Sequence, residues 1–172
     1  YAGVWATENT RGALFDAMMR KEVYATTGPR MRLRMFAGYD LTNRDLSADP
    51  CRLYRRAVAM GGDLAAAPTG RAPHILVSVL KDPVGANLDR VHIVKGWVDA
   101  SGQSHEKVFD VAWSDPAHRR PGSNGRLPAV GNTVDLATAT YRNSIGAAEL
   151  RTVWTDPQFN PSERAFYYVR AL

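Results

Sequence analysis

The sequence predicts a mainly β protein, an antiparallel two-sheet sandwich of immunoglobulin-like form preceded by one N-terminal α-helix. Two observations support this fold class. The apolar residues change from helical spacing to strict alternation across the Gly28-Pro29 break. Beyond residue 29, about seven or eight strand-like segments bounded by turn residues follow one another, with no helical segment interleaved. This order favours two antiparallel sheets over a parallel α/β sheet.

The N-terminal helix is predicted from a cap and an apolar band. Asn9 and Thr10 can cap a helix, and the residues that follow place an apolar band at helical spacing. The band consists of Leu14, Phe15, Ala17 and Met18. The segment Thr26–Pro29 is expected to end the helix. The band must be buried against either its own sandwich or an absent domain, and the sequence leaves both possibilities open.

The strands are predicted from alternation and from bounding turns. They are expected at residues 30–36, 74–80, 89–98, 105–113, 133–141, 149–154 and 164–170. Segment 74–80 is almost continuously apolar, so we expect a central strand there. Segment 51–60 fits either a short helix or an edge strand. Segment 115–131 is rich in Pro, Gly, Arg and Ser and is expected to be a long loop.

Composition limits the function classes. The 172 residues fit one domain, or one domain plus a fragment. No run approaches the ~18 apolar residues of a membrane span. The net charge is +5, but 17 acidic residues are interspersed among 22 basic ones, so we expect no dedicated nucleic-acid role. The start Tyr1–Ala6 has no signal-peptide pattern, and we expect an internal piece of a longer chain.

No pattern in the sequence predicts a catalytic or metal site. The four histidines have no metal-ligand spacing, and neither a nucleophile elbow nor a phosphate-binding loop is present. The lone Cys51 cannot form an internal disulfide and has no zinc spacing around it. We therefore predict no catalytic residue and no metal ligand. A site built from scattered His and Asp residues is the remaining enzymatic hypothesis.

Three arginines are the candidate ligand-binding residues. Arg30, Arg32 and Arg34 alternate with apolar residues, which places them on one face of the predicted strand. Successive guanidinium groups would repel one another unless an anionic group lies opposite. That group is either a carboxylate of the protein or of a neighbouring domain, or an anionic ligand such as phosphate or an acidic glycan.

The chain also resembles a known family through eight segments that occur in order. These segments are Glu8–Arg11, Tyr24–Arg30, Met60–Asp63, Leu88–Arg90 with Ile93–Trp97, Val111–Trp113, Asn143–Leu150, Val153–Pro157 and Arg164–Arg170. Together they resemble the C-terminal portion of a family of large, uncharacterised bacterial proteins. That family is similar to the PHP (polymerase and histidinol phosphatase) metal-dependent phosphoesterases.

The resemblance implies that this chain and the upstream barrel have different roles. Residues 1–28 resemble the last helical segment of a PHP-like barrel, and residues 29–172 resemble its appended accessory β-sandwich. The metal ligands of the family and its divalent metal belong to the barrel upstream, so no cofactor is expected in this chain. The implied role is non-catalytic: packing on the barrel as its partner, or assembly into a homo-oligomer. An anion- or carbohydrate-binding module is the alternative. An extracytoplasmic location is the expectation for a bacterial protein of this type.

Overall fold

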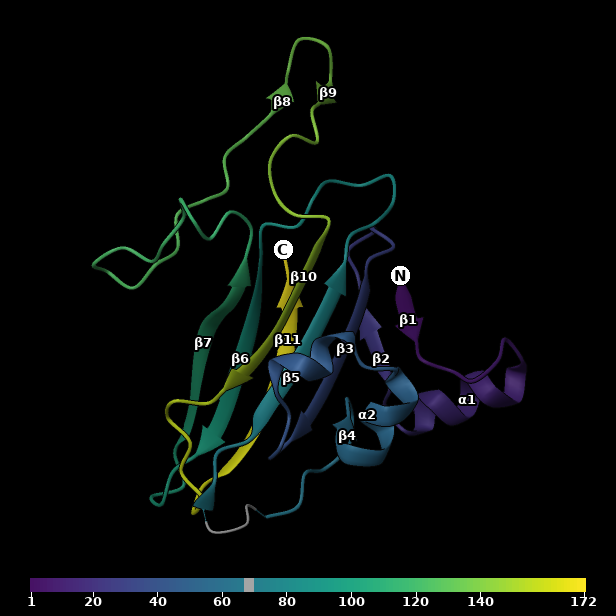
Figure 1. Ribbon diagram of the computed structural model, residues 1–172, viewed down its shortest axis with the longest axis vertical. Helices are drawn as coiled ribbons and strands as arrows, with labels where there is room; N and C mark the ends of the chain where they lie inside the picture. The colour runs from purple at the N-terminus through teal and green to yellow at the C-terminus, as the bar shows by residue number, and fades with distance from the viewer. Residues whose placement is uncertain (67–69) are drawn as a thin grey trace.

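The computed structural model describes residues 1–66 and 70–172, and Figure 1 shows its elements in order. The N-terminal half contains β1 (Ala2–Val4), α1 (Arg11–Met19), β2 (Val23–Ala25), β3 (Arg32–Gly38), the 3-10 helix η1 (Asn43–Ser47), α2 (Pro50–Arg56) and β4 (Val58–Ala59). The remainder contains β5 (His74–Leu80), β6 (Arg90–Val98), β7 (Ser104–Trp113), β8 (Val134–Asp135), β9 (Thr140–Tyr141), β10 (Glu149–Thr155) and β11 (Arg164–Ala171).

Two antiparallel sheets form the sandwich, as the sequence predicts. One sheet has the strand order β10-β5-β3-β4 and the other has the order β11-β6-β7. The edge strands β7 and β10 contact each other, and the rings of Phe109 and Trp154 lie 4.9 Å apart across that side. Two further antiparallel ribbons, β1-β2 and β8-β9, stand outside these sheets. The β8-β9 hairpin projects from the top of the view in Figure 1.

The main core lies between the two sheets. Alternate residues of β5 are fully buried there, and they face apolar residues of β6. Its buried members are Leu33, Ile75, Val77, Val79, Leu88, Val91, Ile93 and Leu150. The opposite face of the β5 sheet is covered by η1 and α2, around the buried side chains of Phe36, Leu41, Leu53 and Leu76. This double cover explains why segment 74–80 is apolar at nearly every position and confirms its prediction as a central strand.

The N-terminal helix forms, but it ends earlier than the sequence suggests. Thr10 caps it, and its side chain accepts a hydrogen bond from the Ala13 N–H. The helix ends at Met19, where Lys21 adopts a left-handed conformation (φ 60°) and its N–H bonds the Met18 carbonyl. The Glu22 N–H bonds the Ala17 carbonyl, which completes a Schellman motif. A lysine rarely occupies that position, so no residue type before Thr26 signals the end of the helix.

Two other segments were predicted differently or left open by the sequence. Segment 133–141 is not one strand but the hairpin of β8 and β9. The Asp135 carboxylate accepts hydrogen bonds from the N–H groups of Ala137 and Thr138, and this turn interrupts the strand. Segment 51–60 forms both of its alternatives in succession, because α2 is followed by β4.

A buried ion pair connects the two sheets. Lys95 is 2% exposed, and its ammonium lies 2.7 Å from an Asp156 carboxylate oxygen and 2.6 Å from the Gln158 carbonyl. The Tyr167 hydroxyl donates to the same carboxylate oxygen at 2.7 Å. Burial first, and then this hydrogen bond, raises the pKa of Tyr167. The contacts join β6, β11 and the segment that follows β10, so they fix the two sheets to each other.

We expect the substitution Asp156→Asn to destabilise the domain by about 3–5 kcal/mol, because the Lys95 ammonium is then buried without a counter-charge. Urea unfolding monitored by tryptophan fluorescence measures the change. The double variant Lys95→Met with Asp156→Leu removes both charges. It is expected to lose less unfolding free energy than Asp156→Asn alone. Equal losses in the two variants would contradict the ion-pair account.

Candidate functional site

The edge of β3 that faces away from β5 is covered by hydrogen-bond donors. They come from residues 1–28 and from Met60, which follows β4. β3 pairs with β4 only at Phe36 and Ala37, which leaves the carbonyls before them without a strand partner. The Tyr24 hydroxyl bonds the Met31 carbonyl at 3.0 Å, and the Trp5 indole N–H bonds the Leu33 carbonyl at 2.7 Å. The Met60 N–H bonds the Met35 carbonyl at 3.0 Å. Alternate residues of the strand direct their carbonyls to this edge, and each of these three carbonyls therefore has a donor.

The outer edge of β11 is open. Arg90 and Leu172 exchange both backbone hydrogen bonds, so the even-numbered residues of β11 direct their N–H and C=O groups toward β6. The odd-numbered residues direct theirs away from β6, and none of these groups has a hydrogen-bond partner within residues 1–66 and 70–172. They are Ala165, Tyr167, Val169 and Ala171.

An apolar groove of about 530 Å³ lies beside this open edge. Residues from β3, β4, the β2 segment and the last half of β11 line it. The apolar lining includes Met31, Leu33, Met35, Tyr167, Val169 and Ala171. Among the residues that the structure describes, Lys21 and Arg170 line it with charged side chains, and no Asp or Glu does. The sequence does not predict this groove, because alternation along 164–170 predicts the strand but not which of its edges lacks a neighbour.

The structure does not present the three predicted arginines as one open row. Arg30 precedes β3, its N–H bonds the Asp82 carboxylate, and its guanidinium lies 5.9 Å from the centroid of the Tyr1 ring. That hydrogen bond is the largest cause of the lowered pKa of Asp82. Arg32 and Arg34 share the outer face of β3, and Arg32 is exposed. Anion binding by Arg30, Arg32 and Arg34 stays a prediction.

Arg34 belongs to a cluster that joins the N-terminal segment to α2. Its guanidinium lies 3.7 Å from the centroid of the Trp5 ring. Its Nε and Nη1 atoms are buried without a partner among the described residues. Nearby, the buried Glu22 carboxylate accepts from the Tyr54 hydroxyl and pairs with Arg20 at 2.7 Å. Burial first, and then the bond to Glu22, raises the pKa of Tyr54 to about 12.

The histidines stay apart, each with its own partner. His74 contacts the Leu41 carbonyl at 2.6 Å, and the other three pair with separate carboxylates. Those pairs are His92–Asp110, His105–Asp99 and His118–Asp115. No group of three His, Cys, Asp or Glu side chains suited to a metal ion is found in the part of the chain that the structure describes. The hypothesis of a site built from scattered His and Asp residues therefore gains no geometric support.

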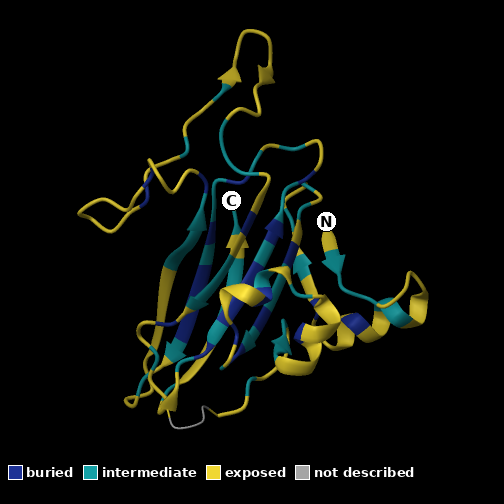
Figure 2. Cartoon of the chain, viewed as in Figure 1, coloured by how far each residue is buried: buried dark blue, intermediate teal, exposed yellow. Residues whose placement is uncertain are grey.

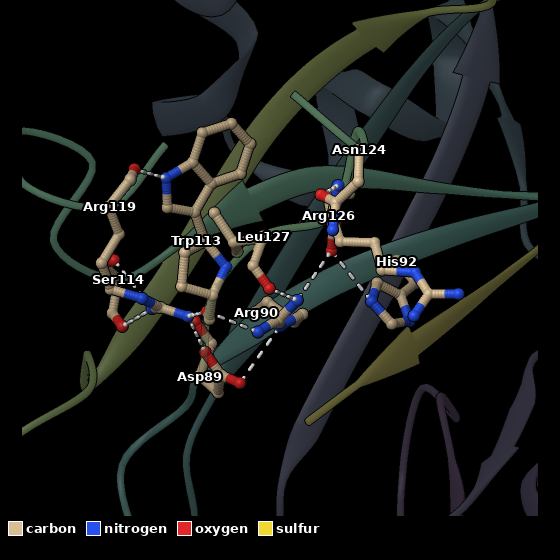
Figure 3. A network of polar contacts seen from close by, with 11 residues as sticks. Asp89, Arg90, His92, Trp113, Ser114, Arg119, Asn124, Arg126 and Leu127 are labelled. Atoms are coloured by element: carbon tan, nitrogen blue, oxygen red, sulfur yellow. Dashed lines mark hydrogen bonds and ion pairs between the residues drawn. The ribbon is translucent and has the colours of Figure 1, made fainter. Parts of the chain in front are cut away.

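The most extensive polar network fastens the long loop to the ends of β6 and β7 (Figure 3). The nearly buried Arg119 donates to the Asp89 carboxylate at 2.5 Å and to the Ser114 hydroxyl at 2.7 Å. Arg90 donates to the carbonyls of Leu127 and Pro128 at 3.1 and 2.9 Å. The terminal nitrogens of Arg119 are engaged by the network and by loop carbonyls, while its Nε is buried without a partner among the described residues. These contacts account for the position of the loop.

Helix α1 exposes an apolar stripe. Phe15, Met18 and Met19 are 56%, 52% and 65% exposed, and the two methionines follow Phe15 by three and four residues, so each is its neighbour on the helix surface. Ala17 is the fully buried residue of this helix. Figure 2 shows exposed residues over most of α1, in contrast to the largely buried central strands β5 and β6. The sequence predicted the apolar band, and the structure shows that much of it is not covered by the sandwich. Within the described residues, no helix is long and apolar enough to cross a membrane.

We expect the substitutions Trp5→Phe and Tyr24→Phe each to cost about 0.5–1.5 kcal/mol, because each leaves one β3 carbonyl without its donor while retaining an aromatic ring. Chemical unfolding measures the loss of unfolding free energy, and the double variant should lose nearly the sum of the two single losses. Tyr141→Phe is a matched control, since the Tyr141 hydroxyl bonds an exposed loop carbonyl. Unchanged stability in both single variants would contradict the edge-capping role.

Comparisons with known proteins give a single finding. One family model matches residues 1–172, and its description is "Protein of unknown function (DUF3604)". No curated protein and no solved structure matches the chain. The family description names no activity, so the relation to phosphoesterases stays a prediction. Because the match covers the whole chain, the protein belongs to the DUF3604 family.

Proposed function

We propose that this chain is a non-catalytic accessory β-sandwich that packs against the catalytic barrel of a metal-dependent hydrolase or phosphoesterase. The resemblance to PHP-related proteins supplies the identity of the partner. The observation that carries the docking role is the exposed stripe of Phe15, Met18 and Met19 on α1. A group of neighbouring exposed apolar side chains on one helix is a candidate interaction site.

The position of α1 suits this role. The helix lies between β1 and β2, and the Trp5 and Tyr24 side chains on either side of it hold the N-terminal segment to β3. Glu22, which follows the helix, is anchored to Tyr54 of α2. The segment that would enter from a barrel is thus fixed to the sandwich, which gives a barrel on the exposed side of α1 a defined orientation.

The polar clusters are consistent with an accessory role. The buried ion pair of Lys95 and Asp156 and the network around Arg119 connect strands and loops of the domain itself. Under the proposal, the divalent metal and its ligands belong to the barrel. This chain contributes binding area and orientation.

We expect only a longer polypeptide, extended upstream in its natural sequence, to bind stoichiometric divalent metal and hydrolyse a phosphoester. This chain alone should do neither, because the proposal places the ligands in the barrel. Metal analysis of both purified proteins, followed by a p-nitrophenyl phosphate assay, makes the comparison. Stoichiometric metal or turnover in this chain alone would overturn the proposal.

We expect Phe15→Asp combined with Met19→Asp to leave the melting temperature of this chain within a few degrees, because exposed substitutions change stability little. In the longer polypeptide the same pair should lower the melting temperature or expose the junction to proteolysis, since it places charge in a buried interface. The control is Leu136→Asp, an exposed apolar residue (90%) on the distant β8-β9 hairpin. If the α1 variant and the control behave alike in the longer polypeptide, α1 is not the docking face.

A further inference from the structure

We propose that the open edge of β11 and the groove beside it bind an extended, alternately apolar polypeptide segment with acidic residues at its outward positions, by β-strand addition. The surface is defined by the odd-numbered residues of β11 and the apolar lining described above. It uses different residues from the α1 stripe, so this proposal and the proposed function can fail separately.

The conformation of the occupant follows from the backbone of β11. Four consecutive odd-numbered residues direct N–H and C=O groups to the outside, and none has a partner in the described ranges 1–66 and 70–172. The strand has eight residues, which is about 26 Å of edge. Proteins usually block an edge of this length, and β3 shows such a block at Met31, Leu33 and Met35. An unblocked edge presents N–H and C=O groups with which an extended segment can form hydrogen bonds.

The apolar lining specifies alternate side chains of that segment. Tyr167, Val169 and Ala171 are only partly buried, although their side chains point into the space between the sheets. The facing residues Met31 and Met35 are likewise partly buried. A strand added to β11 has every second side chain on this inner face, because side chains alternate across a sheet. Apolar residues at those positions would extend the core along the open side of the sandwich.

The charges select an acidic partner. Lys21 and Arg170 are at the groove, and Arg164 lies at the far end of β11. No carboxylate of the described chain forms an ion pair with any of the three. Arg170 instead donates to the Tyr168 hydroxyl at 2.6 Å. Carboxylates on a neighbouring strand would lie opposite these cations, where opposite charges are favourable and like charges are not.

The same charges disfavour a second copy of this chain in the register that overlaps residues 164–170. Antiparallel pairing of two β11 edges that overlaps residues 164–170 is centred on Tyr167. This register places Arg164 of one copy opposite Arg170 of the other at both ends of the ladder. Like charges directly opposite each other destabilise a strand pair.

The test uses a short fluorescein-labelled synthetic peptide with valine at alternate positions, threonine between them and glutamate at the outward end positions. Fluorescence anisotropy with this chain should show saturable binding. A peptide with lysine in place of glutamate should bind about tenfold more weakly, because two favourable charge pairs become repulsive. A glutamate peptide with N-methylated backbone on its pairing edge should not saturate, since it cannot donate to β11.

Two protein variants make the result specific to the edge. Val169→Pro removes an outward N–H beside the groove and leaves the hydrogen bonds to β6 in place, and it should reduce binding at least about tenfold. Val108→Pro removes an outward N–H from β7, the opposite edge of the same sheet, and it should bind within about threefold of the unmodified chain. Circular dichroism and thermal melting establish that both variants are folded.

Three results would overturn the proposal. The first is that neither peptide binds saturably to the folded chain. The second is that the glutamate and lysine peptides bind equally, or that Val169→Pro binds as tightly as Val108→Pro. The third is sedimentation showing a dimer that Val169→Pro dissociates, which would make a second copy the occupant of the edge.

Discussion

The structure depends on how each sheet edge satisfies its backbone hydrogen-bonding groups. A two-sheet sandwich has four edges, and each exposes a row of N–H and C=O groups unless something covers it. Here β7 and β10 lie against each other, with aromatic rings between them. The edge of β3 is covered by Tyr24, Trp5 and Met60, while the edge of β11 is left open. The sandwich is therefore closed on one side and has a groove on the other.

The capping of β3 also explains the role of the N-terminal segment. Residues 1–28 form α1 and the short β1-β2 ribbon outside the two main sheets, and two of their aromatic side chains bond carbonyls of β3. The backbone around α1 is fixed as a result, and the exposed apolar stripe of the helix is held in place. The predicted boundary at residue 28 remains a prediction about the parent protein, although the segment packs on the sandwich here.

Much of the fold follows from the sequence because it rests on local pattern. The alternation in 89–98 and 105–113 and the apolar run in 74–80 identify β6, β7 and β5 nearly to the residue. The errors arise where one side chain or one unusual backbone dihedral determines where a helix or strand ends. Lys21 ends α1 in a left-handed conformation that its residue type does not announce, and Asp135 turns the chain within an apparently continuous strand. The groove could not be predicted, because it depends on which strands become neighbours, and periodicity carries no information about strand order.

The most direct test of the edge account is native-state hydrogen exchange of the β11 amides in this chain. The account predicts alternation: slow exchange at Phe166, Tyr168 and Arg170, which bond β6, and fast exchange at Tyr167 and Val169, which face the open edge. Uniform slow exchange along the strand would contradict it, because the outer edge would then already have a partner. Uniform fast exchange would equally contradict it, since β11 would not be a stable member of its sheet.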